Sequence, residues 1–175
     1  MRSARVALLL VSCVALVTVT IVTVAHLSAP YVAPVSAQQR AAPPLPDEVM
    51  MPPAVTLTGL RGKPAVINFW ASWCDSCREE APGLERLAMA LRGHVAWVGV
   101  DWNDSLSGGR QFISTYHWSF PVLRDANGVA GEEYGVRGLP STFLLDAKGT
   151  IVSTLLGPQT AGDIQAALTK QALWP

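Results

Sequence analysis

The sequence predicts an α/β domain with a central mixed β-sheet and helices on both faces, preceded by a segment of different character. Two observations predict the sheet. Apolar strand-like segments alternate with helical ones up to about residue 123, and a strand pair followed by a helix closes the chain. A third observation sets the N-terminus apart, because no charged residue occurs over 6–25. We therefore divide the chain into residues 1–27, 28–53 and 54–175.

The first part, residues 1–27, is long enough to cross a membrane. About 20 apolar residues span the roughly 30 Å hydrocarbon core as a helix. Arg2 and Arg5 precede the apolar run and should stay on the cytoplasmic side, so the rest of the chain would face outward. A cleaved signal peptide with a site at Val35–Ala37, and lipid modification of Cys13, are the alternatives to a transmembrane anchor. All three export the C-terminal part.

The second part, residues 28–53, is rich in proline and alanine and shows neither a helical nor a strand period. This composition is typical of an extended, semi-rigid spacer. We therefore expect a linker that holds a monomeric domain away from the membrane. A short strand within 45–51 remains open.

The third part, residues 54–175, contains the segments that predict the fold. Each is assigned from its hydrophobic pattern and from flanking turn or cap residues. The expected strands are 56–57, 65–70, 95–100, 120–123, 142–145 and 151–155, the last two forming a hairpin. The expected helices are 76–92, 109–116 and 160–173, the last with Thr160 and Asp163 spaced as a variant capping box.

Charge and cysteine content argue against two function classes. The 13 basic residues equal the 13 acidic residues in number, and no basic run is present, so nucleic-acid binding has no electrostatic support. A zinc site would need more ligands than Cys74 and Cys77, but Cys13 is the only other cysteine and the three histidines are scattered. We expect no metal and no cofactor.

Cys74 and Cys77 form a C-x-x-C pair between the strand over 65–70 and the helix over 76–92. Cys74 would lie at the N-terminus of that helix, where free N–H groups and the helix dipole favour a thiolate. Asp75 opposes this effect by its charge. Two intervening residues bring the sulfurs within bonding range, so Cys77 can resolve a mixed disulfide formed by Cys74.

Glu80 is the candidate partner for proton transfer. On the predicted helix it shares the apolar face with Cys77, whereas Glu79 points outward. Burial should raise the pKa of the Glu80 carboxyl and suit it to exchange a proton with Cys77. The alternative is a partly exposed carboxylate that only favours the start of the helix. Trp73, directly before the dithiol, should border the substrate surface.

Two motifs resemble those of the TlpA/ResA-type thioredoxin-like thiol–disulfide oxidoreductases. The first is FWASWCDSCREEAP over residues 69–82, and the second is YGVRGLPSTFLLD over residues 134–146. They occur in the expected order and on the expected elements, and the resemblance covers about residues 54–171. It implies a thioredoxin-like fold.

The resemblance also implies site residues. Pro140 corresponds to the family's cis-proline, in a loop that lies against the dithiol. The backbone of Leu139 would then pair with an extended substrate segment. Thioredoxin itself carries a buried aspartate where this chain has Asn68. That difference leaves Glu80 as the acid close to Cys77.

The activity implied by the resemblance is reduction of exported proteins in cytochrome c maturation, with the haem-site cysteines of apocytochrome c as substrate. Electrons would come from a membrane thiol carrier of the DsbD or CcdA type. We expect a single-pass protein of the bacterial cell membrane, with its catalytic domain on the extracytoplasmic or periplasmic side. A disulfide-forming oxidase and a peroxiredoxin-like peroxidase are the alternatives, although the Thr-x-x-Cys motif typical of peroxiredoxins is absent.

Overall fold

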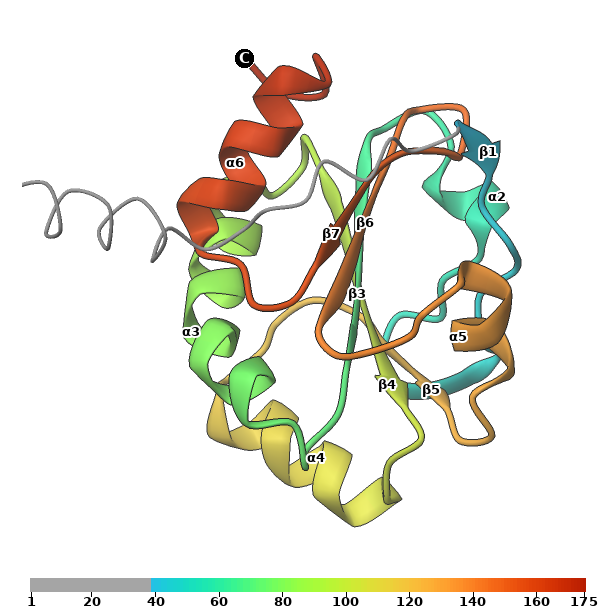
Figure 1. The fold of residues 1–175 in the computed structure, drawn as a ribbon, viewed down its shortest axis with the longest axis vertical. Helices are drawn as coiled ribbons and strands as arrows, with labels where there is room; N and C mark the ends of the chain where they lie inside the picture. Colours follow the sequence, from blue (N-terminus) through green and yellow to red (C-terminus); the bar gives the residue numbers. More distant parts are fainter. Residues whose placement is uncertain (1–38) are drawn as a thin grey trace, which may run out of the picture. The chain divides into compact units, whose positions relative to one another are not determined.

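The computed structural model describes residues 39–175, which form a seven-stranded sheet with helices on both faces (Figure 1). The strand order is β1-β7-β6-β3-β4-β5-β2. At its centre, β3 (Ala65–Trp70) is parallel to β4 (Ala96–Trp102), and β4 is parallel to β5 (Val122–Asp125). On its other side β3 pairs antiparallel with β6 (Ser141–Leu145). The predicted mixed sheet is therefore confirmed.

Helices cover both faces of the sheet (Figure 1), as the sequence predicts. The remaining elements are β1 (Arg40–Ala41), β2 (Glu48–Met51), β7 (Thr150–Leu156), α2 (Leu57–Leu60), α3 (Asp75–Ala90), α4 (Leu106–Thr115), α5 (Val129–Tyr134) and α6 (Ala161–Lys170). Figure 1 shows α3 and α6 on one side of the sheet and α2 and α5 on the other. A capping box at Thr160 and Asp163 starts α6, as expected.

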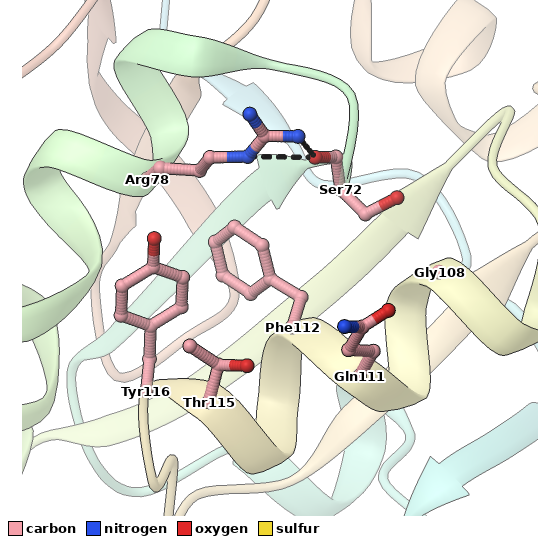
Figure 2. Close-up of a pocket in the computed structure, with 7 residues that line it drawn as sticks. All are labelled: Ser72, Arg78, Gly108, Gln111, Phe112, Thr115 and Tyr116. Atoms are coloured by element: carbon pink, nitrogen blue, oxygen red, sulfur yellow. Dashed lines mark hydrogen bonds between the residues drawn. The ribbon is translucent and has the colours of Figure 1, made fainter.

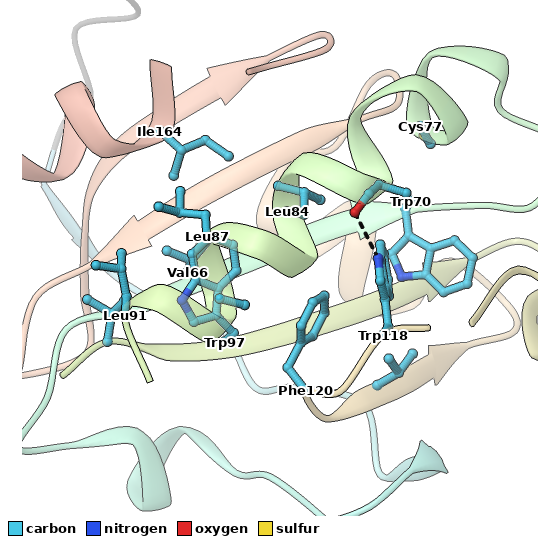
Figure 3. Close-up of a cluster of buried hydrophobic side chains, with 14 of the residues drawn as sticks. Val66, Trp70, Cys77, Leu84, Leu87, Leu91, Trp97, Trp118, Phe120 and Ile164 are labelled. Carbon is cyan, nitrogen blue, oxygen red and sulfur yellow. Dashed lines mark hydrogen bonds between the residues drawn. The ribbon is translucent and has the colours of Figure 1, made fainter. Parts of the chain in front are cut away.

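Two apolar cores lie against the two faces of the sheet. All six residues of β3 are buried, as expected of a central strand covered on both sides. Figure 3 shows the core under α3, where Trp70, Leu84 and Ile164 pack together with Trp118. The Trp118 indole N–H donates to the backbone carbonyl of Ala81 at 3.2 Å. This core fixes α3, and with it the dithiol, against the sheet.

Two short helices differ from the sequence prediction. Residues 56–57 are not a strand, because the Thr56 side chain accepts a hydrogen bond from the Gly59 N–H at 3.2 Å and caps α2. In α5, which no pattern predicts, Gly128 and Gly135 flank the helix with φ values of 74° and 78°. A six-residue helix is too short to show a clear hydrophobic period.

The sheet also includes residues that the sequence places in the linker over 28–53. In β1, Arg40 pairs with Ile151 and Ala41 with Thr150 of β7, and β2 pairs with β5. The domain therefore begins well before residue 54, and the strand considered within 45–51 is present. The predicted anchor over 1–27 lies outside the described residues. No helix within residues 39–175 is long and apolar enough to span a membrane.

Candidate active site

The dithiol lies where β3 ends and α3 begins. Cys74 is the N-cap residue of α3, Cys77 lies in its first turn, and the two form a disulfide with a Cα–Cα distance of 5.3 Å. The Cys74 Sγ accepts a hydrogen bond from the Cys77 N–H at 3.1 Å. This contact would stabilise a thiolate at Cys74 once the bond is reduced. Cys74 is 6% exposed and Cys77 is 1% exposed, so Cys74 is the more accessible cysteine.

Glu80 is buried on the face of α3 that carries Cys77, as predicted. Its exposed fraction is 6%, whereas Glu79 is exposed. Oε1 accepts a hydrogen bond from Asn68 Nδ2 and Oε2 accepts one from the Gln159 N–H, both at 3.0 Å. The carboxyl is therefore held between β3, α3 and the loop that precedes α6. The contact with Gln159 could not be read from the sequence, because 79 residues separate the two groups.

The surroundings of Glu80 bring its titration into the neutral range. Burial raises the pKa of the carboxyl to about 7, although the hydrogen bonds from the Gln159 N–H and from Asn68 act in the opposite direction. The raised pKa agrees with the sequence prediction. A carboxyl of this pKa can accept and release a proton near pH 7. Proton exchange with Cys77 itself stays a prediction.

Asp104, in the loop after β4, holds the segment that precedes the dithiol. Its carboxylate accepts the Ser72 N–H at 2.5 Å and the Ser72 hydroxyl at 3.0 Å. The Trp73 indole N–H donates to the Asn103 carbonyl at 3.2 Å, while 55% of Trp73 stays exposed. Trp73 thus borders open surface next to Cys74. Asp104 was not predicted from the sequence, and the available signal was an acidic residue soon after the expected strand over 95–100.

Arg78 ties α3 to the same segment (Figure 2). Its Nε and Nη2 donate to the Ser72 carbonyl at 3.0 and 2.6 Å, and its Nη1 pairs with Asp75 at 2.8 Å. A pocket of about 260 Å³ opens beside Arg78 and Ser72, with Phe112 and Tyr116 from the α4 side. The Arg78 guanidinium is therefore engaged by the Ser72 carbonyl and by Asp75, rather than by the sulfurs.

The loop before β6 brings Leu139 and Pro140 to the dithiol end of the sheet. The peptide bond between them is cis, as the resemblance implies. Ser141 pairs with Phe69 of β3, so the next position in this antiparallel register sets Pro140 opposite Trp70, at the end of the strand that leads to the dithiol. Pro140 is buried and Leu139 is half-buried. The pairing of the Leu139 backbone with a substrate stays a prediction.

A C-x-x-C disulfide at a helix N-terminus, on this sheet, next to a cis-proline loop, is an arrangement suited to thiol–disulfide exchange. Residues 45–154 match the AhpC/TSA family. This chain belongs to the AhpC/TSA family. Within residues 39–175 no group of three His, Cys, Asp or Glu side chains is placed to hold a metal ion.

Relatives of this AhpC/TSA-family chain include thiol–disulfide oxidoreductases. It is 34% identical to the thioredoxin-like protein YneN of Bacillus subtilis over 116 residues, which are 65% of this chain and 68% of YneN. It is 31% identical to the thiol-disulfide oxidoreductase ResA of Bacillus thuringiensis over 117 residues, 66% of this chain and 68% of ResA. It is 39% identical to the thiol:disulfide interchange protein DsbE of Pseudomonas fluorescens over 104 residues, 59% of this chain and 57% of DsbE. The chain thus spans little more than half the length of DsbE.

A solved structure agrees with these relationships. The secreted Mycobacterium tuberculosis disulfide oxidoreductase that is homologous to E. coli DsbE matches with a TM-score of 0.64 and 28% identity. The match covers 72% of this chain and 95% of the mycobacterial one. The AhpC/TSA-family chain is a thioredoxin-like thiol–disulfide oxidoreductase of the TlpA/ResA type, which confirms the predicted family and enzyme class.

Proposed function

We propose that this chain is a membrane-anchored oxidoreductase that works outside the bacterial cytoplasm and reduces disulfides in exported proteins. The uncharged apolar run over 6–25 supports the anchor. The similar mycobacterial oxidoreductase is a secreted protein, which supports export. Reduction of the substrate disulfide and re-reduction of the Cys74–Cys77 disulfide are both exchanges between thiols and disulfides. The reaction therefore requires no cofactor.

The buried Glu80 carboxyl, one turn after Cys77, is the observation that carries the reductive direction. A dithiol becomes a strong oxidant when its reduced form is stabilised. A charged carboxylate near the sulfurs opposes a thiolate, and the Arg78 charge is directed to Ser72 and Asp75. The Glu80 charge therefore offsets part of the stabilisation that the start of α3 gives the Cys74 thiolate, and such a dithiol gives up its electrons more readily.

In the proposed reaction the Cys74 thiolate attacks one sulfur of a substrate disulfide. A mixed disulfide forms, and the other substrate sulfur leaves as a thiolate. Glu80 takes the proton of Cys77, whose sulfur then attacks the Cys74 Sγ and expels the second substrate thiolate. Two electrons have passed to the substrate, whose two sulfurs take up one proton from Glu80 and one from solvent. Trp73 and the Leu139 backbone would hold the substrate segment, with Pro140 shaping that loop.

The substrate and the electron donor in this proposal follow from the resemblance to the ResA type. The substrate would be the haem-site cysteines of apocytochrome c. A membrane thiol carrier of the DsbD or CcdA type would return the Cys74–Cys77 disulfide to the dithiol. The arrangement of Trp73 and Leu139 suits an extended segment of a protein, because strand-like backbone pairing needs a length of exposed chain.

A reduction potential measured against glutathione tests the direction. We expect a value closer to that of thioredoxin, about −270 mV, than to that of DsbA, about −120 mV. A value near that of DsbA would instead favour the disulfide-forming oxidase. Rapid consumption of hydrogen peroxide by the reduced protein would favour the peroxidase.

Substrate trapping tests the roles of the two cysteines. Cys77→Ser removes the resolving sulfur, so mixed disulfides between Cys74 and exported proteins should accumulate and be released by reductant. Cys74→Ser is the matched control and should trap little, because the remaining cysteine of the pair, Cys77, is 1% exposed. Equal trapping by the two variants would contradict the assignment.

A further inference from the structure

Asp101, near the end of β4, has a carboxyl without a donor to satisfy it. Its exposed fraction is 0%, and no N–H or hydroxyl group donates to either oxygen. It lies in register between Trp70 of β3 and Arg124 of β5. From α4, Gly109 closes over it, since a Cβ at Gly109 would collide with the Asp101 Oδ2. A bare carboxylate is strongly disfavoured in such a place.

The charged groups around Asp101 add to this effect. Asp104 lies three residues further along the chain, and Glu48 of β2 pairs with Arg124 at 3.1 Å. The Arg124 Nη2 also donates to the backbone carbonyl of Asp104 at 3.1 Å. The Arg124 charge is thus already engaged by the Glu48 carboxylate and by a backbone carbonyl. On α4 the charged residue Arg110 is exposed, and the part that covers Asp101 is glycine.

A proton on Asp101 removes both the cost of a buried charge without a donor and the repulsion from the nearby carboxylates. When two carboxyls meet, one can keep its proton and donate it to the other in a strong charge-assisted hydrogen bond. Burial, followed by the charge of Asp104 and a hydrogen bond with it, raises the pKa of Asp101 to about 8. Arg124 acts in the opposite direction and Glu48 in the same direction. Asp101 is therefore the neutral member of the pair at pH 7.

We propose that Asp101 is a positioning residue, which donates its proton to the Asp104 carboxylate and so fixes the Ser72–Trp73 segment beside the dithiol. The chain of contacts is short. In this proposal the Asp104 carboxylate accepts the Asp101 proton, in line with the Asp104 hydrogen bond that helps to raise the Asp101 pKa. The same carboxylate accepts the N–H and hydroxyl of Ser72. The loop that carries Asp104 also accepts the Trp73 indole N–H through the Asn103 carbonyl.

When Asp101 loses its proton, the hydrogen bond to Asp104 is replaced by repulsion between the two carboxylates. Two carboxylates then face each other beneath α4, and Asp104 shifts away from its present contacts. The environment of Trp73 should therefore change as pH rises through about 8. Because the effect concerns only the shape of the surface next to Cys74, it does not depend on the direction of electron flow or on the substrate.

The test follows two NMR signals in the full-length chain in detergent, kept oxidised so that Cys74 and Cys77 cannot titrate. Carboxyl ¹³C labelling of aspartate reports Asp101, and ¹⁹F-labelled tryptophan reports Trp73, assigned with Trp73→Phe. We expect Asp101 to titrate near pH 8, against about 3.9 for an ordinary aspartate. The ¹⁹F signal of Trp73 should move with the same midpoint.

Asp101→Asn supplies an N–H donor for Asp104 that cannot ionise, so the Trp73 signal should stay constant between pH 7 and about 9 in this variant. Glu80→Gln is the control for the other buried carboxyl with a raised pKa and should leave the Trp73 titration in place. An Asp101 that is already ionised at pH 6, or a Trp73 titration that persists in Asp101→Asn, would overturn the inference. If Asp101→Asn does not fold, the wild-type protein alone decides the question. Different titration midpoints for the Asp101 ¹³C signal and the Trp73 ¹⁹F signal would contradict the link between the two residues.

Discussion

Glu80 shows how strongly burial acts on a single side chain in this domain. It receives two hydrogen bonds that favour its charged form, and still its pKa is raised to about 7 because desolvation outweighs both. The Asn68 Nδ2 that donates to Glu80 also donates to Thr142 on β6. The acid is thereby fixed to the central strands as well as to α3.

Glu80→Gln should lower the apparent pKa of the cysteines and slow resolution of the mixed disulfide. Glutamine keeps the volume but removes both the charge that opposes a thiolate and the acceptor for the Cys77 proton. Loss of a general base reduces rates by roughly a hundredfold or more. The rate of alkylation of the reduced protein against pH gives the pKa, and stopped-flow mixing with a substrate disulfide gives the resolution rate.

Glu79→Gln is the matched control, because Glu79 is exposed on the same helix turn. It should leave both measurements unchanged. Identical alkylation profiles for the wild type and Glu80→Gln would mean that Glu80 acts only as a carboxylate near the start of α3.

The position of a site residue was predictable from the sequence where it depends on the spacing within a single helix or strand. Helical spacing puts Glu80 on the face of Cys77, and the apolar pattern of α3 marks that face as buried. Asp104 was not predictable in this way, because it reaches Ser72 across 32 residues of sequence. Nor does any local pattern show that Asp101 lies under α4 with no donor.

Among the elements, β3, the β6–β7 pair and α6 were predictable because each has a continuous apolar pattern or a cap. The strand β1 was not predictable, and β2 was only left open as a strand within 45–51, since they have two and four residues and proline-rich flanks. Their conformation comes from pairing with β7 and β5. Tertiary pairing here overrides a local composition typical of a spacer.

A chain that begins at Ala54 should be markedly less stable than one that begins at Gln39. The shorter chain loses the Arg40 hydrogen bond to the Tyr134 carbonyl at 2.7 Å and leaves the Tyr134 hydroxyl without its acceptor, the Pro43 carbonyl at 2.9 Å. It also loses Leu45, which is 9% exposed. A buried leucine contributes about 1.5–3 kcal/mol, and an unpaired buried hydroxyl costs about 1–3 kcal/mol.

Urea denaturation of the two oxidised chains measures this difference. We expect the free energy of unfolding to fall by about 3 kcal/mol or more in the shorter chain, a large part of the stability of a typical domain. Equal midpoints would show that β1 and β2 add nothing to the stability of the sheet.

For the molecule as a whole, Glu80 and Asp101 make stability depend on pH. Their pKa values in the folded state, about 7 and about 8, lie above the ordinary values of 4.5 and 3.8. The folded protein therefore binds more protons than the unfolded chain, and stability is lost as pH rises through these values. For Asp146 and Asp163, whose pKa values are lowered, stability is lost only in more acidic solution.

The oxidised protein should accordingly be more stable at pH 5 than at pH 8. For Glu80 alone, a shift from 4.5 to about 7, at about 1.4 kcal/mol per pKa unit, corresponds to about 3 kcal/mol. Urea denaturation at both pH values measures the difference, and Glu80→Gln should reduce it. A wild-type protein that is more stable at pH 8 would contradict the raised pKa values.

The position of β1 has a practical consequence for handling the protein. β1 pairs with Thr150 and Ile151 at the end of the sheet where β3 begins, whereas Cys74 follows the other end of β3. The six residues of β3 separate these ends by about 20 Å. A chip, bead or electrode coupled to the chain ahead of Arg40 would therefore sit behind the domain and leave its sulfurs open to solution. Coupling through α4 would bring the solid support against Trp73 and obstruct electron exchange.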